Sequence, residues 1–267
     1  MLIFGLGYTA ARIAAALCAG GWTVEATGSA GTLAFTDRAA VRAALARADH
    51  VLSSVPPAEG SDPVLDRYGE QLGHGWLGYL SSTGVYGDTR GAWVDETAPT
   101  DRGRRTARSA ADARWMSLGA RVFRLPGIYG PGRSALDRVR RCRAQRIDLP
   151  GQVFSRVHVE DIVSGVIAGL DGPPGAYNLA DDHPCSQNAV IEEACRLLGC
   201  APPPLQTLEE ADLSPMARGF YAENRRVANG KAKRVLEWAP AYPTYREGLA
   251  ALVQGFAPSR QGAKKSQ

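Results

Sequence analysis

Short apolar runs alternate with amphipathic stretches along the first half of the chain. The apolar runs predict buried strands, and the amphipathic stretches between them predict helices. The expected strands are Leu2–Phe4, Thr23–Thr27, His50–Val55, Trp76–Ser81 and Arg121–Leu125, with Thr32–Phe35 as a candidate for one more. The expected helices are Ala10–Ala19, Asp37 to about Arg47, Pro63–Leu72 and about Thr106–Leu118. This alternation predicts an α/β fold, a Rossmann-like doubly wound parallel sheet buried on both faces.

The second half of the chain is less regular. Its one expected strand is Ala176–Leu179, and its expected helices are Ser134–Arg146, Val157–Leu170, Gln187–Leu198, Lys231–Leu236 and Tyr245–Phe256. We therefore predict a Rossmann core over residues 1–125. Residues 126–256 are expected to supply the remaining core strands and a small C-terminal α/β substrate lobe, and residues 257–267 a disordered tail.

Composition narrows the class of protein. Hydrophobic residues make up 45% of the 267 residues and charged residues 22%, which is typical of a globular protein. No apolar run approaches the roughly 18 residues of a membrane span, and the chain opens on a strand rather than a basic segment, so we expect a cytoplasmic protein. Five cysteines without a C-x-x-C pair, and four histidines without ligand spacing, predict neither a disulfide framework nor a metal site.

A glycine-rich turn follows the first expected strand and opens the first helix. Its residues Gly5, Leu6, Gly7, Tyr8, Thr9 and Ala10 read G-x-G-x-x-A. In this motif the first glycine permits a tight turn, the second lets the backbone approach a pyrophosphate, and the small third residue packs helix against strand. Backbone N–H groups at the helix start attract phosphate. The motif in this context predicts dinucleotide binding.

The end of the second strand decides between the two nicotinamide cofactors. NAD(H) binding usually uses an acidic residue there, and NADP(H) binding uses a nearby arginine. The segment from Ala26 to Ala30 contains neither. Since no carboxylate would repel a 2′-phosphate, we expect a slight preference for NADP(H) over NAD(H). Arg12 and Arg38 are the candidates to bind that phosphate.

Four motifs in order resemble a known family. The segment Tyr79–Asp88, YLSSTGVYGD, resembles the S-S-x-x-V-Y-G segment of extended short-chain dehydrogenases, the NAD(P)-dependent epimerase/dehydratase family. The others are Val94–Pro99 (VDETAP), Phe123–Gly132 (FRLPGIYGPG) and Arg156–Ile162 (RVHVEDI). The G-x-G-x-x-A opening and compact size are most similar to the atypical, reductase-like members.

The resemblance implies a set of catalytic and cofactor-binding residues. Ser82 takes the family's Ser/Thr position beside Thr83, and Tyr86 is a second candidate hydroxyl. The family's Y-x-x-x-K pair is replaced by Arg104 and Arg108. Arg108 can hold ribose hydroxyls, whereas an arginine is a poor proton shuttle near neutral pH. The further expected cofactor contacts are Ser54, Val55, Pro126 and Gly127.

The same resemblance suggests where a substrate binds. The expected contacts are Arg104, Tyr129, Arg133 and Arg156, with Arg133 opening a basic stretch that runs to Arg146. Arginines at these places suit a small polar or anionic substrate, such as a nucleotide sugar. The alternative to substrate binding is structural in both places. The basic stretch would then be a solvated helix face, and Arg156 and His158 would hold a loop through backbone contacts.

Two functions from different classes remain open. The first is an NAD(P)-dependent reductase or epimerase/dehydratase-type enzyme, which the retained Ser82 and Tyr129 loop favour. The second is a non-catalytic dinucleotide-binding sensor, which the missing tyrosine–lysine pair favours. We expect a monomer or homodimer that binds neither membrane nor nucleic acid, because the net charge of +4 is small and no aromatic residues interleave the arginines.

Overall fold

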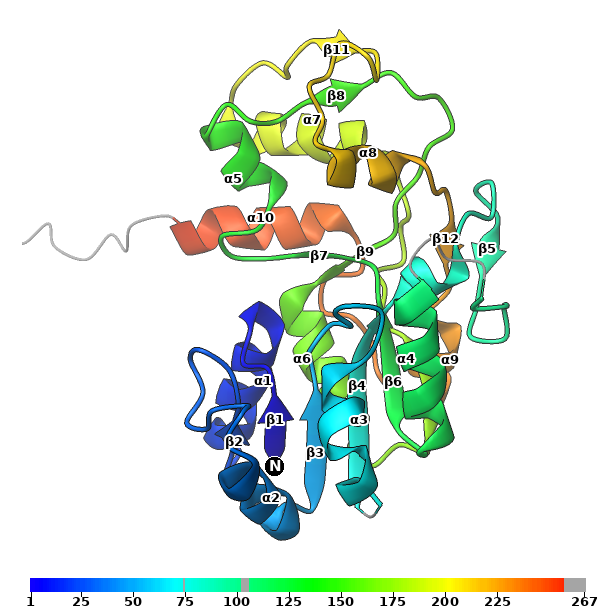
Figure 1. Ribbon diagram of the computed structural model, residues 1–267. Helices are drawn as coiled ribbons and strands as arrows, with labels where there is room; N and C mark the ends of the chain where they lie inside the picture. The colour runs from blue at the N-terminus through cyan, green and yellow to red at the C-terminus, as the bar shows by residue number, and fades with distance from the viewer. Residues whose placement is uncertain (74, 102–105, 257–267) are drawn as a thin grey trace, which may run out of the picture.

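A parallel sheet of six strands forms the centre of the protein. The computed structural model describes residues 1–73, 75–101 and 106–256. The strand order is β10-β6-β4-β3-β1-β2 (Figure 1). The strands are β1 (Leu2–Phe4), β2 (Glu25–Ala26), β3 (His50–Ser53), β4 (Trp76–Ser82), β6 (Arg121–Leu125) and β10 (Gly175–Asn178). The chain runs from β1 out to β2 and then returns to β3 on the other side of β1. This reversal creates a topological switch point, where such sheets bind ligands.

Helices cover both faces of the sheet, as the apolar strands require. One face packs against α1 (Tyr8–Ala19), α6 (Val159–Ala168) and α9 (Gly230–Val235). The other packs against α2 (Arg38–Arg47), α3 (Pro63–Tyr68), which continues into the 3₁₀ turn η1 (Gly69–Gln71), and α4 (Thr106–Ser117). Aspartates start two of these helices: Asp37 accepts from the backbone N–H of Ala40, and Asp62 accepts from those of Val64 and Leu65.

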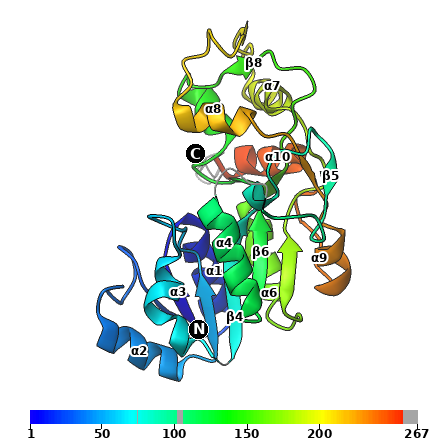
Figure 2. The same cartoon turned by 45° about the vertical axis from the view of Figure 1, so that its right-hand side comes forward.

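A second lobe lies beyond the carboxyl ends of the strands (Figures 1 and 2). Its helices are α5 (Ala135–Arg140), α7 (Gln187–Leu198), α8 (Pro215–Tyr221) and α10 (Tyr245–Phe256). Three short parallel pairs connect or brace it: β7 (Gly127–Tyr129) with β9 (Arg156–His158), β8 (Arg146–Ile147) with β11 (Leu205–Gln206), and β5 (Trp93–Val94) with β12 (Arg226–Val227). A small core joins α10 to α5, α7 and β7.

The predicted fold class is confirmed, and three predicted elements are wrong. The helix expected over Val157–Leu170 begins only at Val159, because strand β9 runs to His158. Thr32–Phe35 is not a strand, because within it only Leu33 forms a β-bridge, to Thr27 after β2. The helix expected over Ser134–Arg146 ends at Arg140, because Cys142 has a positive φ of 53° and Arg146 begins β8. The predicted tail, 257–267, lies outside the described residues.

Candidate functional site

The turn between β1 and α1 has the shape that a phosphate needs. Gly5 has φ +83°, and a Cβ there would lie 2.9 Å from Val55 Cγ2 and 3.1 Å from Ser54 Oγ. Ser54 also donates its hydroxyl to the Gly5 carbonyl. The Cβ position of Gly7, in contrast, has no atom within 4 Å. The turn is therefore closed on the side of β3 and open above Gly7.

Helix α1 begins without a side chain that competes for its N-terminal N–H groups. Gly7 is its N-cap, no side chain caps it, and its first turn contains no acidic residue. Thr9 and Ala10 are buried against the sheet, as the motif requires of Ala10. Backbone N–H groups and the positive end of the helix dipole are thus available to an anion.

The end of β2 supports the turn from the other side. The Thr27 hydroxyl accepts from Gly5 N (3.1 Å), and the Thr27 carbonyl accepts from Leu6 N (2.9 Å). Gly28, Ser29 and Ala30 follow and are exposed, without a carboxylate among them. Thr27 was missed by our sequence analysis, although a hydroxyl at the end of the second strand is a usable signal.

Arg12, a candidate 2′-phosphate ligand, is engaged elsewhere. Its guanidinium donates to the Tyr8 carbonyl (2.9 Å), lies 4.0 Å from the centre of the Tyr8 ring and is 3.4 Å from a Glu160 carboxylate oxygen. Arg38, the other candidate, is exposed at the start of α2.

Tyr8 connects α1 to the second lobe. Its hydroxyl donates to the Pro131 carbonyl (3.1 Å) in the loop after β7. Arg133 from the same loop places its guanidinium 4.9 Å from the centre of the Tyr8 ring. A side chain at Gly130 would clash with the Tyr8 hydroxyl and with Val159. Arg133 therefore stands at the start of α1 rather than deep in the second lobe.

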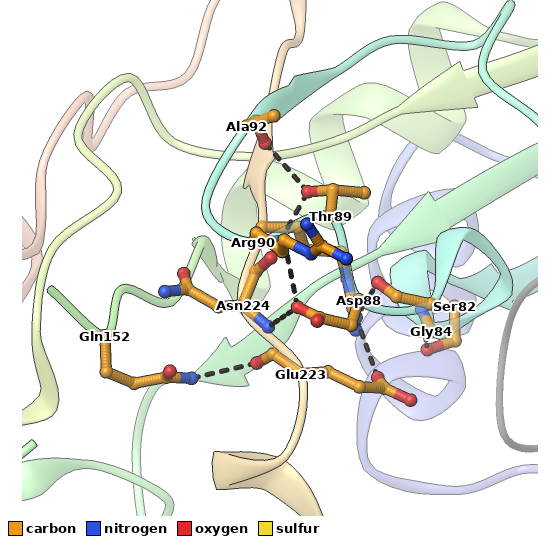
Figure 3. A network of polar contacts seen from close by, with 11 residues as sticks. Ser82, Gly84, Asp88, Thr89, Arg90, Ala92, Gln152, Glu223 and Asn224 are labelled. Atoms are coloured by element: carbon orange, nitrogen blue, oxygen red, sulfur yellow. Dashed lines mark hydrogen bonds and ion pairs between the residues drawn. The ribbon is translucent and has the colours of Figure 1, made fainter.

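Ser82 lies at the carboxyl end of β4, next to β6. It pairs in register with Leu125, which precedes Pro126, so the predicted Ser82 and Pro126–Gly127 positions share one edge of the sheet. The Ser82 hydroxyl accepts from Gly84 N (3.1 Å) and caps η2 (Thr83–Tyr86), as Figure 3 shows. This contact uses an acceptor site of the half-buried hydroxyl and leaves its O–H to donate. Thr83 beside it is buried.

The loop after η2 is fastened to the segment before β12. Asp88 accepts from the backbone N–H groups of Arg90 (3.0 Å) and Asn224 (2.8 Å), and Gln152 donates to the Glu223 carbonyl (2.8 Å) (Figure 3). Arg225 donates to the Gly87 carbonyl (2.8 Å) and pairs with the Glu223 carboxylate (2.7 Å). These contacts hold the segment after Ser82 in one conformation.

Tyr86 lies in a buried polar network under the sheet edge. Its hydroxyl donates to Asn178 Oδ1 (2.7 Å) and accepts from Arg124 Nη1 (3.0 Å). Arg124 in turn pairs with Asp112 (2.7 Å), which also accepts from Ser81. Burial raises the pKa of Tyr86, which opposes its ionisation. With both hydrogen-bonding roles taken by protein groups, Tyr86 holds β4, β6 and β10 together.

Arg108 is a cation without a matching anion in the described part of the chain. It is half-buried on α4, and no hydrogen bond or ion pair to another described residue involves it. It lies close enough to Tyr79 to oppose the upward shift that burial imposes on the pKa of that phenol. The hydroxyls of Tyr79, Ser109 and Ser53 are buried and have no hydrogen-bond partner among described residues. Arg108 was a predicted cofactor-binding residue, whereas the three hydroxyls, which belong to β4, α4 and β3, were not predicted.

The other predicted substrate residues point away from this edge. The Tyr129 hydroxyl is directed at Gly248 in α10, where a Cβ would collide with it. Arg156 is buried and donates to the carbonyls of Phe154 (2.9 Å), Cys185 (3.1 Å) and Ser186 (3.3 Å). Both side chains therefore contact other parts of the second lobe. For Arg156, this agrees with the structural alternative, in which it holds a loop through backbone contacts. Arg104 lies outside the described residues.

His158 and Asp161 have structural partners. His158 Nδ1 accepts from Glu160 N (3.3 Å) at the start of α6, and burial lowers the pKa of His158 to about 4. Asp161 accepts from Ala241 N (2.6 Å) and Tyr242 N (3.2 Å). In the described ranges, no three His, Cys, Asp or Glu side chains are arranged to hold a metal ion, and no helix is long and apolar enough to cross a bilayer.

Solved structures resemble the whole chain. A functionally unknown conserved protein from Silicibacter pomeroyi DSS is 41% identical, with a TM-score of 0.85 over 95% of this chain and 98% of that one. UDP-glucose 4-epimerase from Thermus thermophilus, solved with NAD, is 20% identical, with a TM-score of 0.72 over 97% and 100% of the two chains. The human epimerase family protein SDR39U1, solved with NADPH, is 13% identical, with a TM-score of 0.71 over 95% and 99%.

Sequence relatives among named proteins match only in part. A 3-diazoavenalumate denitrifying reductase from a Streptomyces species is 33% identical over 144 residues, 49% of this chain and 46% of that protein. Protein YeeZ from Escherichia coli K12 is 27% identical over 171 residues, 57% of this chain and 54% of that protein. The chain thus spans about half the length of these relatives. No protein-family model matches the sequence.

Proposed function

Because the chain belongs to the same family as the conserved Silicibacter protein and has the fold of the NAD(P)-dependent epimerases and dehydratases, the extended short-chain dehydrogenase/reductases, we propose that it is a nicotinamide-dependent oxidoreductase. Its substrate in this proposal is a small polar or anionic molecule. The observation that carries the proposal is the turn at Gly5–Tyr8, closed toward β3 but open above Gly7. A relative named as a reductase makes hydride transfer the first chemistry to test.

The residues at the sheet edge fit a nicotinamide dinucleotide. The pyrophosphate would be held by N–H groups at the start of α1, beside the open Gly7, with Arg133 as a nearby cation. Arg108 would hold ribose hydroxyls, which would give its half-buried guanidinium the partner that the described protein groups do not supply. When bound, the nicotinamide ring would supply or accept a hydride.

The end of β2 favours NADP(H) over NAD(H) in this proposal. The exposed segment Gly28–Ala30 presents no carboxylate that would repel a 2′-phosphate or bind the ribose diol. Since Arg12 is paired with Tyr8 and Glu160, Arg38 is the better candidate for the charge.

Ser82 is the proposed catalytic hydroxyl. Its oxygen accepts from Gly84 N, which orients the O–H toward an incoming carbonyl or hydroxyl oxygen at the end of β4. Donation from this O–H would stabilise negative charge on the reacting oxygen. Neither nearby tyrosine serves as the general acid, because the Tyr86 hydroxyl both donates and accepts within the protein and the Tyr129 hydroxyl faces α10. The proton therefore comes from water or from a group of the substrate.

Two measurements test the proposal in sequence. Thermal-shift titrations with NAD⁺, NADH, NADP⁺ and NADPH should find binding, strongest for an NADP form. Oxidation of the winning reduced cofactor should then be followed with small keto acids and nucleotide sugars. With a turned-over substrate, Ser82→Ala should lower kcat by roughly 10²-fold, the cost of one positioned donor, while the cofactor Kd stays unchanged. Ser117→Ala, at an exposed site on α4, is the control.

The alternative function is a dinucleotide-binding sensor without turnover. The observation that favours it is the saturation of the Tyr86 hydroxyl by Asn178 and Arg124. A sensor would bind the dinucleotide with similar affinity in the wild type and in Ser82→Ala, and no candidate substrate would oxidise the reduced cofactor. Turnover that depends on Ser82 would exclude it.

A further inference from the structure

Two cysteines meet at the end of helix α7, in the second lobe. Gly199 follows the helix with φ +67° and donates its N–H to the Arg196 carbonyl (3.3 Å). The N–H of Cys200 donates to the Cys195 carbonyl (3.0 Å). These two bonds define a Schellman motif, in which the side chains of the first and last residues normally form an apolar contact. Here both of those side chains are thiols.

The two cysteines lie at the same helix end and differ in exposure. The Cys200 N–H donates to the Cys195 carbonyl (3.0 Å), and Cys200 lies close enough to Cys195 to raise the pKa of its thiol. Cys195 is 1% exposed, whereas Cys200 is open to solvent. Burial and the neighbouring Cys200 raise the pKa of Cys195, so Cys195 remains a thiol at neutral pH. An oxidant from solvent therefore reaches Cys200 first, and Cys195 lies on the last turn of the helix to which Cys200 is bonded.

The sequence alone hides this pair. Cys195 and Cys200 are five residues apart, a spacing that matches neither a C-x-x-C motif nor one face of a regular helix, and the cysteine pattern predicted no disulfide framework. The left-handed turn at Gly199 reverses the chain and brings Cys200 back over the last turn of α7.

We propose that Cys195 and Cys200 form a reversible intramolecular disulfide when a hydroperoxide oxidises the exposed thiol. In the first step the Cys200 thiolate attacks the peroxide, an S–O bond forms as the O–O bond breaks, and with hydrogen peroxide the other oxygen leaves as water. The Cys195 sulfur then attacks Cys200, an S–S bond forms, and the hydroxyl leaves as a second water with the thiol proton. Two thiols and one peroxide thus give one disulfide and two waters.

The geometry of the helix end, which holds the two residues next to each other, allows Cys195 to act as a resolving cysteine. It would intercept the sulfenic acid on Cys200 before a second peroxide converts it to sulfinic acid, which thiols do not reduce. The helix end already brings the two residues together, because the Schellman bonds hold both in place. The site lies in the second lobe, on a helix separate from the glycine turn, so oxidation should leave dinucleotide binding unchanged.

The chain offers a direct assay for this bond. Arg196 lies between the two cysteines, so trypsin separates them into peptides 157–196 and 197–218, which remain joined only by a disulfide. Reduced, full-length protein is treated with one equivalent of hydrogen peroxide, alkylated under denaturing conditions, digested and analysed by mass spectrometry. We expect the joined peptides as the main oxidised product, and their separation by dithiothreitol. Because 157–196 also contains Cys185, the assay is repeated with Cys185→Ser.

Three variants make the result decisive. Cys200→Ser, which changes an exposed side chain, should abolish the joined peptides and leave Cys195 unmodified at the same dose. Cys195→Ala should leave Cys200 as a sulfenic acid that a second equivalent of hydrogen peroxide converts to sulfinic acid, and Cys18→Ser, on α1, should change nothing. Circular dichroism and thermal unfolding establish that each variant is folded. Sulfinic acid on Cys200 of the wild type without joined peptides, or joined peptides that vanish in Cys185→Ser, would overturn the proposal.

Discussion

At the scale of single residues, the hydroxyls of Ser82 and Tyr86 illustrate how hydrogen-bond partners decide roles. Both residues belong to the segment that resembles the family motif, yet only Ser82 keeps a donor free at the sheet edge. Tyr86 donates to Asn178 and accepts from Arg124 inside a buried network. A hydroxyl with an unused donor can form a hydrogen bond to a substrate, whereas one that already donates and accepts within the protein contributes to stability.

This difference predicts the behaviour of Tyr86→Phe. The variant keeps the ring and removes two buried hydrogen bonds, so it should lower the free energy of unfolding by about 1–3 kcal/mol. Chemical denaturation measures this loss. Dinucleotide affinity and any kcat should stay within about threefold of the wild type, since the Tyr86 ring still fills its site. A variant of unchanged stability that has lost turnover would instead identify Tyr86 as a catalytic acid.

A second prediction at this scale concerns pH. Burial raises the pKa of Asp181 to about 7, against its ordinary value of 3.8, and Arg156 only partly offsets this. The folded state therefore holds this proton more tightly than the unfolded state does. The contribution to stability is full below the unfolded-state pKa and is lost as pH rises toward 7.

Asp181→Asn should remove this pH dependence. Between pH 4 and pH 8, the free energy of unfolding of the variant should rise relative to that of the wild type by about 1–3 kcal/mol. Urea denaturation at several pH values measures the difference. The exposed Asp212→Asn is the matched control and should follow the wild type. A difference between wild type and Asp181→Asn that is constant over this range would contradict the buried, protonated Asp181.

Single residues also show where sequence reasoning ends. The glycine turn was predictable, because the requirement for glycine at position 5 is local. The backbone has φ +83° there, and a side chain would collide with Val55. The buried Tyr79 hydroxyl near Arg108, which has no hydrogen-bond partner among described residues, was not predictable. Strand β4 and helix α4 meet only through tertiary packing. Likewise, Arg156 resembles a substrate ligand in sequence, and only the fold reveals that carbonyl groups take its donors.

At the scale of elements, helix α1 is tied to the loop after β7. Tyr8 donates across to Pro131, and its ring is in contact with the guanidinium groups of Arg12 and Arg133. This contact positions Arg133 at the helix start, where the proposed pyrophosphate would bind. The motifs around Tyr8 and Tyr129 were each visible in the sequence, but the contact joins residues 123 positions apart, for which a single sequence contains no signal.

Two variants of Tyr8 separate the hydroxyl from the ring. Tyr8→Phe removes only the bond to Pro131, which is exposed, and should weaken dinucleotide binding by no more than about threefold. Tyr8→Ala also removes the surface on which Arg133 rests, a contact worth about 1 kcal/mol, and should weaken binding about fivefold or more. Isothermal titration calorimetry measures both values. Equal effects, or none from Tyr8→Ala, would show that Arg133 is not held at the site by this ring.

At the scale of the whole molecule, the strand order accounts for the location of the site. Reversal of the chain between β2 and β3 opens the sheet edge at β1 and β3, and the second lobe lies beyond that edge (Figures 1 and 2). Alternating strands and helices predicted this sheet well. The second lobe was predicted less well, because its short elements, such as β8 and β11, owe their form to packing rather than to periodicity.

The most direct test of the account is dinucleotide binding to Gly7→Asp. The Cβ position of Gly7 has no protein atom within 4 Å, so the fold should tolerate the aspartate. Its bulk and charge would occupy the space proposed for the pyrophosphate. Gly69→Asp is the matched control, since Gly69 also has open space around its Cβ position and lies after α3. Calorimetry with NADPH and NADH should find binding in the wild type and Gly69→Asp, and none in folded Gly7→Asp. Unchanged affinity in Gly7→Asp would contradict a dinucleotide site at this turn.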